Sequence, residues 1–448
     1  MLLNLTVKNW MSYRDEASLN LMSTRERQHM ETLSHLPKFR SKKVLPAVSI
    51  YGGNASGKTA MFKAIAALKE MVTTDPGVNG TLPAAPFALD DCSQLHPTTF
   101  EVMFLAGDNV YRFTVEFTRS GITYESLDLV RDKEEVSVYE RDYHAEKPLV
   151  FETDLFSDPT HVEYAAKSTR ANQTFLGSAV AQNIVELREA YEWFAFSLVT
   201  VGVGSNPWSF ARMAVQEQGF LAYAGRTLAR LDTGVVKLVG DPVGADVLPS
   251  DAKLLNQINE LGEHEVMTLV TNKELADYGF ELYTIRRQDG RPQIERLRTV
   301  HVGPDGKEHQ LSLSEESSGT QRLMGLLPML FDLTAQGDYA GGSVYVVDEL
   351  DRCMHTMLTS QLIEDFVSTC NEDTRKQLLF TTHDLLLMDQ SLLRRDEMYI
   401  AQRDADGCSE LIGLSEYEGI RKDKDLIRSY LEGRFGGIPM LTGGEQIG

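Results

Sequence analysis

The amino-acid sequence predicts an α/β fold with a mixed sheet, an antiparallel β-subdomain and a helical insertion. Three features predict this arrangement. The apolar strand Val44–Tyr51 runs into a glycine-rich turn and a helix over residues 57–72. Residues 98–141 alternate as the strands of an antiparallel meander do. A second apolar strand, Ser343–Val347, ends in two carboxylates.

The remaining elements follow from the same patterns. Residues 2–8 and 16–21 are predicted to form a hairpin, and residues 279–301 a second one around Asp289-Gly290. Residues 180–275 are mainly helical in pattern, and no heptad persists for three repeats, which predicts a compact insertion. We therefore expect an N-terminal lobe over residues 1–150, a helical insertion over 151–278 and a C-terminal lobe over 279–448.

Composition excludes several classes of protein. The 448 residues carry 65 acidic and 44 basic side chains, a net charge of −21, which argues against a protein that coats nucleic acid by bulk charge. No run of roughly 18 or more apolar residues occurs and no secretory signal is recognisable, so we expect a cytoplasmic protein without a membrane span. Four widely spaced cysteines predict neither a zinc site nor a disulfide framework.

Basic side chains are scarce, so two concentrations of them stand out. Each of these two basic segments is either a solvated surface or a surface that binds a partner. The first segment, residues 22–43, is either a solvated loop or a flap that contacts phosphate or a partner. The second is either an exposed hairpin or a nucleic-acid contact. The residues are Arg25, Arg27, Lys38, Arg40, Lys42 and Lys43 in the first, and Arg286, Arg287, Arg291, Arg296 and Arg298 in the second.

The strongest motif lies between the strand that ends at Tyr51 and the helix that follows it. It matches G-x-x-x-x-G-K-[ST], a phosphate loop whose backbone N–H groups surround a phosphate at a helix N-terminus. We expect Lys58 to neutralise the β- and γ-phosphates and Thr59 to hold Mg²⁺. The nucleotide-binding residues are Gly52, Gly53, Asn54, Ala55, Ser56, Gly57, Lys58 and Thr59.

The two carboxylates after Ser343–Val347 complete a hydrolytic site. Strand ends of α/β sheets are where ligands bind. Asp348 is predicted to coordinate Mg²⁺, and Glu349 to act as the general base that activates the attacking water. Lys58 and Asp348 are 290 positions apart, a separation that compact NTPases do not need but an ABC-type head with an insertion does.

Such a head requires a signature before the acidic strand and a histidine after it. The sequence has both. Glu316 is followed by a predicted helix N-terminus, an anion-binding end that in ABC-type heads contacts the γ-phosphate held by the other subunit. His383, in Phe380–Asp384, follows an apolar strand and fits a switch histidine, and Leu350–His355 lies at the D-loop position. The signature residues are Ser317, Ser318, Gly319 and Thr320.

Together these motifs resemble the ABC/SMC-like ATPases of the OLD-like AAA group. Closer resemblance is to the RloA-like abortive-infection ATPases, and AriA of the PARIS defence system is a similar head. This closer likeness lies in residues 9–21 (NWMSYRDEASLNL), Pro97–Glu101, Leu392–Arg395, Arg421–Asp423 and Tyr430–Pro439. The resemblance implies an ABC/SMC-type P-loop ATPase head that uses ATP and Mg²⁺ and forms a homodimer or higher oligomer through composite sites.

The resemblance also implies a role in prokaryotic antiviral defence. Such a head is a sensor or scaffold, toxin–antitoxin-like, for a separately encoded TOPRIM-like or other nuclease or toxin. Only 65 residues follow His383, and residues 404–407 (Asp-Ala-Asp-Gly) look like a hairpin turn, so we expect no intrinsic nuclease. A phage protein or nucleic acid is a further expected partner, at the basic segments.

Two alternatives and two departures stay open at this stage. The alternatives are an SMC-like DNA-repair or DNA-end-binding head and a transporter cassette. The D-loop has Met354-His355-Thr356 where related heads often have Leu-His-Pro, and the signature has serine and threonine where transporters have glycine and glutamine. Gln94 is the candidate for a glutamine loop.

Overall fold

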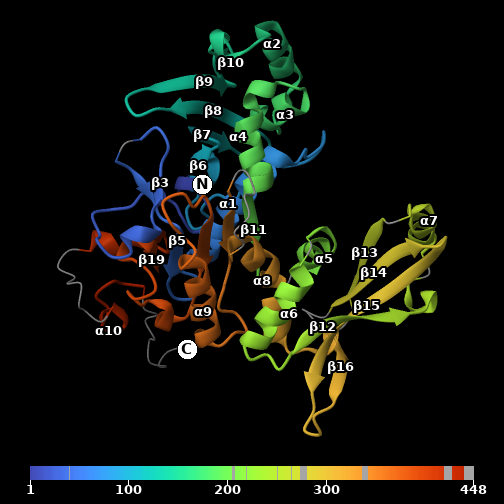
Figure 1. The fold of residues 1–448 in the computed structure, drawn as a ribbon. Helices are drawn as coiled ribbons and strands as arrows, with labels where there is room; N and C mark the ends of the chain where they lie inside the picture. Colours follow the sequence, from blue (N-terminus) through green and yellow to red (C-terminus); the bar gives the residue numbers. More distant parts are fainter. Residues whose placement is uncertain are drawn as a thin grey trace, which may run out of the picture. The chain divides into compact units, whose positions relative to one another are not determined.

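The computed structural model describes residues 1–39, 41–203, 207–217, 219–249, 251–263, 265–272, 280–334, 342–417 and 426–437. Arg40, Arg421–Asp423 and residues 438–439, named above, lie outside the described residues. The chain forms two compact units. The first comprises Met1–Thr200, Gly337–Leu350 and Ile363–Gly448, and the second Val201–Gln336 and Asp351–Leu362 (Figure 1). The chain therefore passes from the first unit to the second twice, at residues 201 and 351, and returns each time.

The described part of the first unit contains a six-stranded sheet, a seven-stranded sheet and the two-stranded sheet β3-β4. Its strands are β1 (Leu2–Lys8), β2 (Ala17–Asn20), β3 (Ser34–His35), β4 (Lys43–Val44), β5 (Ala47–Tyr51), β6 (Thr98–Ala106), β7 (Asn109–Phe117), β8 (Ile122–Val130), β9 (Glu135–Asp142), β10 (Leu149–Phe151), β11 (Leu198–Val201), β17 (Val344–Val347), β18 (Gln377–Thr381), β19 (Met398–Arg403) and β20 (Ser409–Gly413). Its helices are α1 (Lys58–Thr73), α2 (Pro159–Ser168), α3 (Phe175–Ala181), α4 (Arg188–Glu192) and α10 (Leu426–Leu431), and α9 (Thr356–Val367) spans the boundary between the units.

A six-stranded sheet in the order β11-β17-β18-β5-β19-β20 carries the predicted motifs. β17, β18, β5 and β19 pair in parallel, so their carboxyl ends lie at one edge. Every residue of β5 and of β18 is buried, which explains why both read as continuous apolar runs. This sheet fixes where the loops that follow each strand converge.

A seven-stranded antiparallel sheet, β10-β9-β8-β7-β6-β1-β2, forms the second layer of this unit. It confirms the predicted hairpin over residues 2–21 and the predicted meander over 98–141. The helix α1 has the predicted buried face, Met61, Ile65, Leu68 and Val72, and this face joins the core that includes both sheets. The mixed α/β fold with an antiparallel β-subdomain is therefore confirmed.

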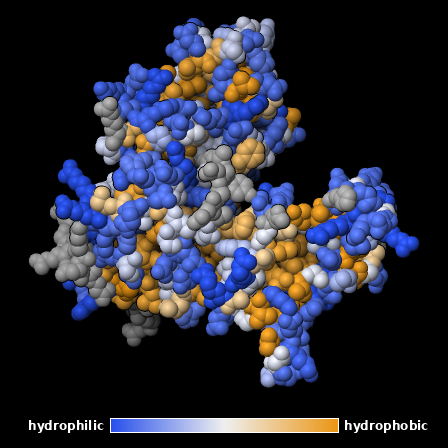
Figure 2. All heavy atoms as spheres, in the orientation of Figure 1, coloured by the Kyte–Doolittle hydropathy of each residue, from blue (hydrophilic) through white to orange (hydrophobic). Residues whose placement is uncertain are grey.

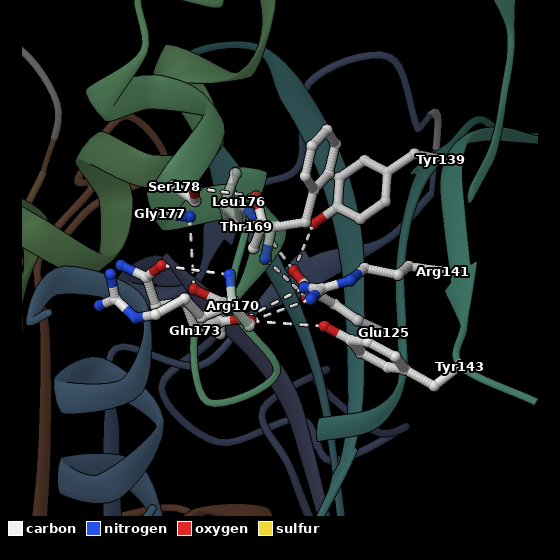
Figure 3. A network of polar contacts seen from close by, with 12 residues as sticks. Glu125, Tyr139, Arg141, Tyr143, Thr169, Arg170, Gln173, Leu176, Gly177 and Ser178 are labelled. Carbon is white, nitrogen blue, oxygen red and sulfur yellow. Dashed lines mark hydrogen bonds and ion pairs between the residues drawn. The ribbon is translucent and has the colours of Figure 1, made fainter. Parts of the chain in front are cut away.

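A buried polar network ties α3 to the antiparallel sheet (Figure 3). Glu125 on β8 is fully buried, and its carboxylate accepts hydrogen bonds from the backbone N–H groups of Phe175 (2.7 Å) and Leu176 (3.0 Å). The Tyr139 hydroxyl, at 2.8 Å, and the Arg141 guanidinium, at 3.3 Å, donate to the same carboxylate. Four donors offset the cost of burying this charge. The α3 helix is thereby fixed to the sheet.

Among its described residues, the second unit combines four helices with an antiparallel sheet. Its elements are α5 (Pro207–Gln216), α6 (Phe220–Arg230), β12 (Lys237–Val243), α7 (Ala252–Glu260), β13 (Val266–Asn272), β14 (Phe280–Gln288), β15 (Arg291–Val302), β16 (Glu308–Ser312) and α8 (Ser318–Thr334). The strand order is β12-β15-β14-β13, and β16 also pairs with β15. Aromatic contacts join the helices, with Phe331 of α8 5.5 Å from Phe220 and 5.1 Å from Tyr223 of α6.

Residues 151–278, predicted as a mainly helical insertion, also contain strands. They contain the helices α2 to α7, but also the strands β11, β12 and β13. Residues 151–200 belong to the first unit, where β11 extends the six-stranded sheet. Gly240 and Pro242 interrupt any alternation in β12, and a proline is tolerated there because β12 is an edge strand.

Hydrophobic side chains gather on the surface of the second unit over α5, α6 and β12 (Figure 2). Trp208 on α5 is 59% exposed and Val236, just before β12, is 43% exposed. Exposed hydrophobic surface of this kind marks a candidate site for a protein partner. Among the described residues, no helix has the length and apolar character needed to cross a bilayer.

The basic segment over residues 22–43 is anchored by buried charges near β19. Arg394 is fully buried, binds Asp396 through two hydrogen bonds of 2.8 Å, and donates to the carbonyl oxygens of Gln28 and Glu26. Asp396 in turn accepts from the backbone N–H and hydroxyl of Thr24. The segment is thus packed in place, while its cationic side chains Arg25, Arg27, Lys38 and Lys42 remain exposed.

The neighbouring Glu397 predicts a pH-dependent stability. Burial raises its pKa from 4.5 to about 8, although the backbone N–H of Arg394 donates to it. A raised pKa in the folded state means that the stabilisation is complete below about pH 4.5 and is lost as pH rises through about 8. We expect the free energy of unfolding to fall by at most about 1.4 kcal/mol per pH unit across this window.

The variant Glu397→Gln cannot ionise, so its unfolding free energy should lack this decline. Urea unfolding at several pH values between 5 and 9 measures it, and Glu163→Gln on the exposed face of α2 is the matched control. Equal pH slopes for the wild type and Glu397→Gln would show that Glu397 does not carry the effect.

Candidate functional site

The carboxyl ends of four parallel strands bring the predicted catalytic groups together. β5 leads into the phosphate loop, β17 into Asp348 and Glu349, β18 into His383, and β19 ends at Arg403. These residues are far apart in sequence, and the register of the sheet makes them neighbours. The arrangement follows the rule that α/β sheets bind ligands at this edge.

The phosphate loop passes so close to its neighbours that two positions require glycine. Gly52 has φ +151°, and a Cβ there would lie 2.3 Å from the carbonyl oxygen of Ala401. Gly57 has φ +112°, and its Cβ would lie 2.7 Å from Oγ of Ser409. Any larger residue would push the loop off β19 and β20. The motif glycines are therefore needed both for backbone conformation and for close packing.

Lys58 occupies the first position of α1 and is 5% exposed. Its Nζ donates to the carbonyl oxygens of Gly52, at 2.8 Å, and Gly53, at 2.9 Å. The ammonium group therefore lies over the concave side of its own loop. Because the N-terminus of α1 adds positive potential, both features favour an anion in the loop.

Thr59 and Asp348 lie together, as the sequence predicts for a magnesium site. Thr59 Oγ1 is 3.3 Å from Asp348 Oδ1, so one small ion could contact both oxygens at about 2.1 Å. Asp348 also accepts a 2.7 Å hydrogen bond from the Thr381 hydroxyl, which itself accepts from the backbone N–H of Glu349 at 2.8 Å. Thr381 was not among the predicted site residues, although it lies two residues before His383.

Glu349 and His383 face each other beside the phosphate loop. Glu349 Oε1 is 4.0 Å from His383 Nε2, and the side chains are 29% and 39% exposed. Glu349 has φ +49°, an uncommon conformation for a residue without glycine's freedom, and such backbone is found at functional sites. Both groups are close enough to share one water molecule.

These residues line a cavity of about 610 Å³. Its wall includes the phosphate loop from Asn54 to Thr59, Glu349 and His383, and five residues that sequence reasoning missed: Met11, Ser12, Phe87, Leu89 and Arg403. Buried Asn9 holds part of this wall, because its side chain accepts from the Phe87 N–H and donates to the Ser93 carbonyl. Gln94 and the described residues of 22–43 do not line this cavity.

The loop fits a phosphate ligand by two independent observations. The Ser56 hydroxyl lies within the loop, is buried, and has no hydrogen-bond partner among the residues that the structure describes. The second is the positive potential supplied by the Lys58 ammonium group, which donates to the Gly52 and Gly53 carbonyl oxygens, and by the N-terminus of α1. An unsatisfied donor beside a cationic, glycine-lined concavity is what an anionic ligand would complete.

The predicted signature lies in the second unit, at the N-terminus of α8. Ser317 is the N-cap, since its hydroxyl accepts from the backbone N–H of Thr320 at 3.1 Å. Ser317 and Ser318 are exposed, whereas Thr320 is buried. A Cβ on Gly319 would lie 2.6 Å from the Cys353 carbonyl oxygen, so the D-loop packs directly on the signature.

The predicted arginine stripe on the β14–β15 hairpin is largely engaged within the second unit. Arg298 donates to Asp241 on β12 at 2.8 Å, Arg296 lies 3.8 Å from the same carboxylate, and Arg287 donates to carbonyl groups at the end of α7. The exposed members of the stripe are Arg286 and Arg291.

Residues 404–407 form the predicted hairpin turn. The Asp404 N–H donates to the Cys408 carbonyl oxygen at 2.9 Å between β19 and β20, and the Asp404 carboxylate accepts from the Cys408 N–H at 2.7 Å. The two aspartates there therefore belong to a turn, as expected.

Comparison with known proteins gives a family for this chain. No curated protein matches it. Solved structures with similarity include the SMC head domain from Thermotoga maritima, at 12% identity over 92% of this chain and 98% of that one, with a TM-score of 0.38. Another is an SMC head bound to the C-winged helix domain of ScpA, at 11% identity over 92% and 97%, with a TM-score of 0.40.

A family model described as "AAA domain, putative AbiEii toxin, Type IV TA system" matches residues 48–173 and 240–389, more than half of the chain. The matched ranges contain the phosphate loop, the signature, both acidic residues and His383. The structure places the phosphate loop, the acidic strand and the histidine strand on one sheet, and the same unit contains an antiparallel sheet. The chain belongs to this AAA-domain family.

Proposed function

We propose that this protein binds and hydrolyses ATP at composite sites shared by two copies of the chain, and that it controls a separately encoded toxic effector in antiviral defence. One observation carries the hydrolytic part. Lys58, Thr59, Asp348, Glu349 and His383 converge at one sheet edge, around a loop with the features of a phosphate site.

The proposed binding step uses groups already in place. Lys58 exchanges the Gly52 and Gly53 carbonyl oxygens for phosphate oxygens, and the backbone N–H groups of the loop surround the β-phosphate. Thr59 and Asp348 would hold Mg²⁺, which when bound would neutralise charge on the phosphates. The cavity wall at Met11 and Phe87 would take up the base.

The proposed hydrolytic step depends on Glu349 and His383. Glu349 accepts a proton from the attacking water, which requires it to be ionised and within one water molecule of the γ-phosphate. His383 orients the same water. Thr381 positions both acidic groups, because it donates to Asp348 and accepts from the Glu349 N–H.

The signature supports a second copy of the chain as the partner. Ser318 is exposed at the N-terminus of α8, where the first N–H groups of a helix have no partners within the helix. Such an end attracts an anion. A symmetric pair of chains, each presenting this end to the other's phosphate loop, would complete two sites at once.

The defence role rests on the family and on an available surface. The family description refers to an AbiEii toxin and a type IV toxin–antitoxin system, which supports control of a toxic activity. The exposed hydrophobic surface over α5, α6 and β12 supports a protein partner. We propose a cytoplasmic complex in which the nucleotide state decides whether the effector, a nuclease or another toxin, is held or released.

The variant Glu349→Gln tests the proposed base. It should still bind ATP but hydrolyse it about 100-fold more slowly or worse, because the general base is lost while phosphate contacts remain. Light scattering should then show an ATP-dependent dimer that persists. Glu410→Gln, on the exposed face of β20, is the control. Wild-type turnover in Glu349→Gln would exclude Glu349 as the base.

The variant Lys58→Ala should lose ATP binding, which is measured on the same preparations.

Phage challenge of cells that carry the native gene neighbourhood tests the defence role. We expect protection from the wild type and loss of protection with Lys58→Ala, and mass spectrometry of the purified protein should find a co-encoded effector. If protection does not depend on the gene, and the protein instead retains DNA ends through Arg286 and Arg291, the SMC-like repair function would replace this proposal.

A further inference from the structure

Glu316, the residue before the signature serines, is held away from solvent by the neighbouring sheet. Its side chain is 4% exposed, whereas Ser317 and Ser318 are exposed. Its Oε1 accepts hydrogen bonds from the hydroxyl of Thr299 and from Nε2 of His301, the latter at 2.7 Å. Both donors lie on β15, on the same face of the strand.

The segment leading to the signature has further attachments to the same sheet. Ser312 lies opposite Arg298 in the β15–β16 register, and the Ser314 hydroxyl donates to buried Glu281 of β14 at 2.6 Å. The Glu316 carbonyl oxygen accepts from the Gln321 side chain at 2.9 Å, which joins this segment to the first turns of α8. The position of the signature is therefore set by β14 and β15.

The sign of the Glu316 charge makes this attachment important for an anionic ligand. A carboxylate one residue from the helix N-terminus would repel a phosphate there if its side chain turned outward. With Thr299 and His301 as donors, the carboxylate points into the sheet, and the helix end keeps its positive potential. Loss of the His301 donor would remove one of the two side chains that hold it.

We infer that His301 is a positioning residue of the composite ATP site: it holds Glu316 inward, so that the signature serines can engage the phosphate bound by another copy. This inference rests on the proposed function. His301 contacts no substrate, and it acts through Glu316. His301 lies on β15, which begins at the tip of the β14–β15 hairpin. The hairpin is thus connected to the signature through His301 and Glu316.

The test compares His301→Ala, His301→Gln and a matched histidine variant. His309→Ala removes the neighbouring histidine, which lies opposite His301 in the β15–β16 register and is 60% exposed. Steady-state ATPase rates, ATP-dependent dimerisation and binding of a fluorescent ATP analogue to dilute protomers are measured on the full-length protein. His301→Ala should lower kcat and dimerisation roughly tenfold, with analogue binding unchanged, because the phosphate loop is untouched.

The amide of His301→Gln can donate to Glu316, so this variant should recover most of the rate, and His309→Ala should match the wild type. If His301→Ala retains wild-type kcat and dimerisation while Glu349→Gln still traps a dimer, the positioning role is overturned and the proposed function stands. An equal loss of analogue binding and kcat in His301→Ala, without rescue by glutamine, would also overturn it, as a general structural effect. A wild type that neither hydrolyses ATP nor dimerises would overturn the proposed function itself.

Discussion

The geometry of the site depends on the hydrogen bonds that the buried carboxylate of Asp348 accepts. It lies at the end of β17, contacts Thr59 at the start of α1 and accepts a 2.7 Å hydrogen bond from Thr381 at the end of β18. Three elements separated by up to 322 positions in sequence are thereby joined at one atom, Oδ1. Because Thr381 also accepts from the Glu349 N–H, the same contact fixes the backbone from which the proposed base projects.

The site groups that local sequence patterns mark were predictable, and those set by tertiary packing were not. The phosphate loop, the two acidic residues and His383 each follow an apolar strand, so motif and strand context agree. Thr381 and Phe87 carry no such pattern. Thr381 acts through its position at the end of β18, and Phe87 reaches the cavity because Asn9 holds its loop. Nothing local to either residue indicates these partners.

The fold was predictable to the same extent. The hairpin over residues 2–21, the meander, and the strand–loop–helix unit are built from contacts close in sequence, and the structure has all three. The second unit required more information. β12 contains Gly240 and Pro242 and becomes a strand only because β15 offers it an edge. The sequence predicts a basic stripe of five arginines on one hairpin. In the structure their side chains lie on both faces of that hairpin, and Asp241 forms ion pairs with two of them.

The division of the chain into two units gives the proposed mechanism its physical form. The phosphate loop, Asp348, Glu349 and His383 belong to the first unit, and the signature and residues 351–355 of the D-loop belong to the second. In the proposal, ATP binding is what joins a first unit of one chain to a second unit of another. The D-loop packs on Gly319, so the signature and the D-loop would present one surface to the incoming nucleotide. Effector control would then follow from whether this surface is engaged.

Complementation between two inactive variants tests this central claim most directly. Lys58→Ala disables the phosphate loop. Ser318→Glu places a negative charge in the first turn of α8, where the charge stabilises the helix but repels phosphate. Each variant alone should be inactive. An equimolar mixture should regain roughly a quarter of the wild-type ATPase rate, because half of the random dimers would contain one intact composite site. A mixture that stays inactive although both variants fold and associate would contradict a site shared between chains.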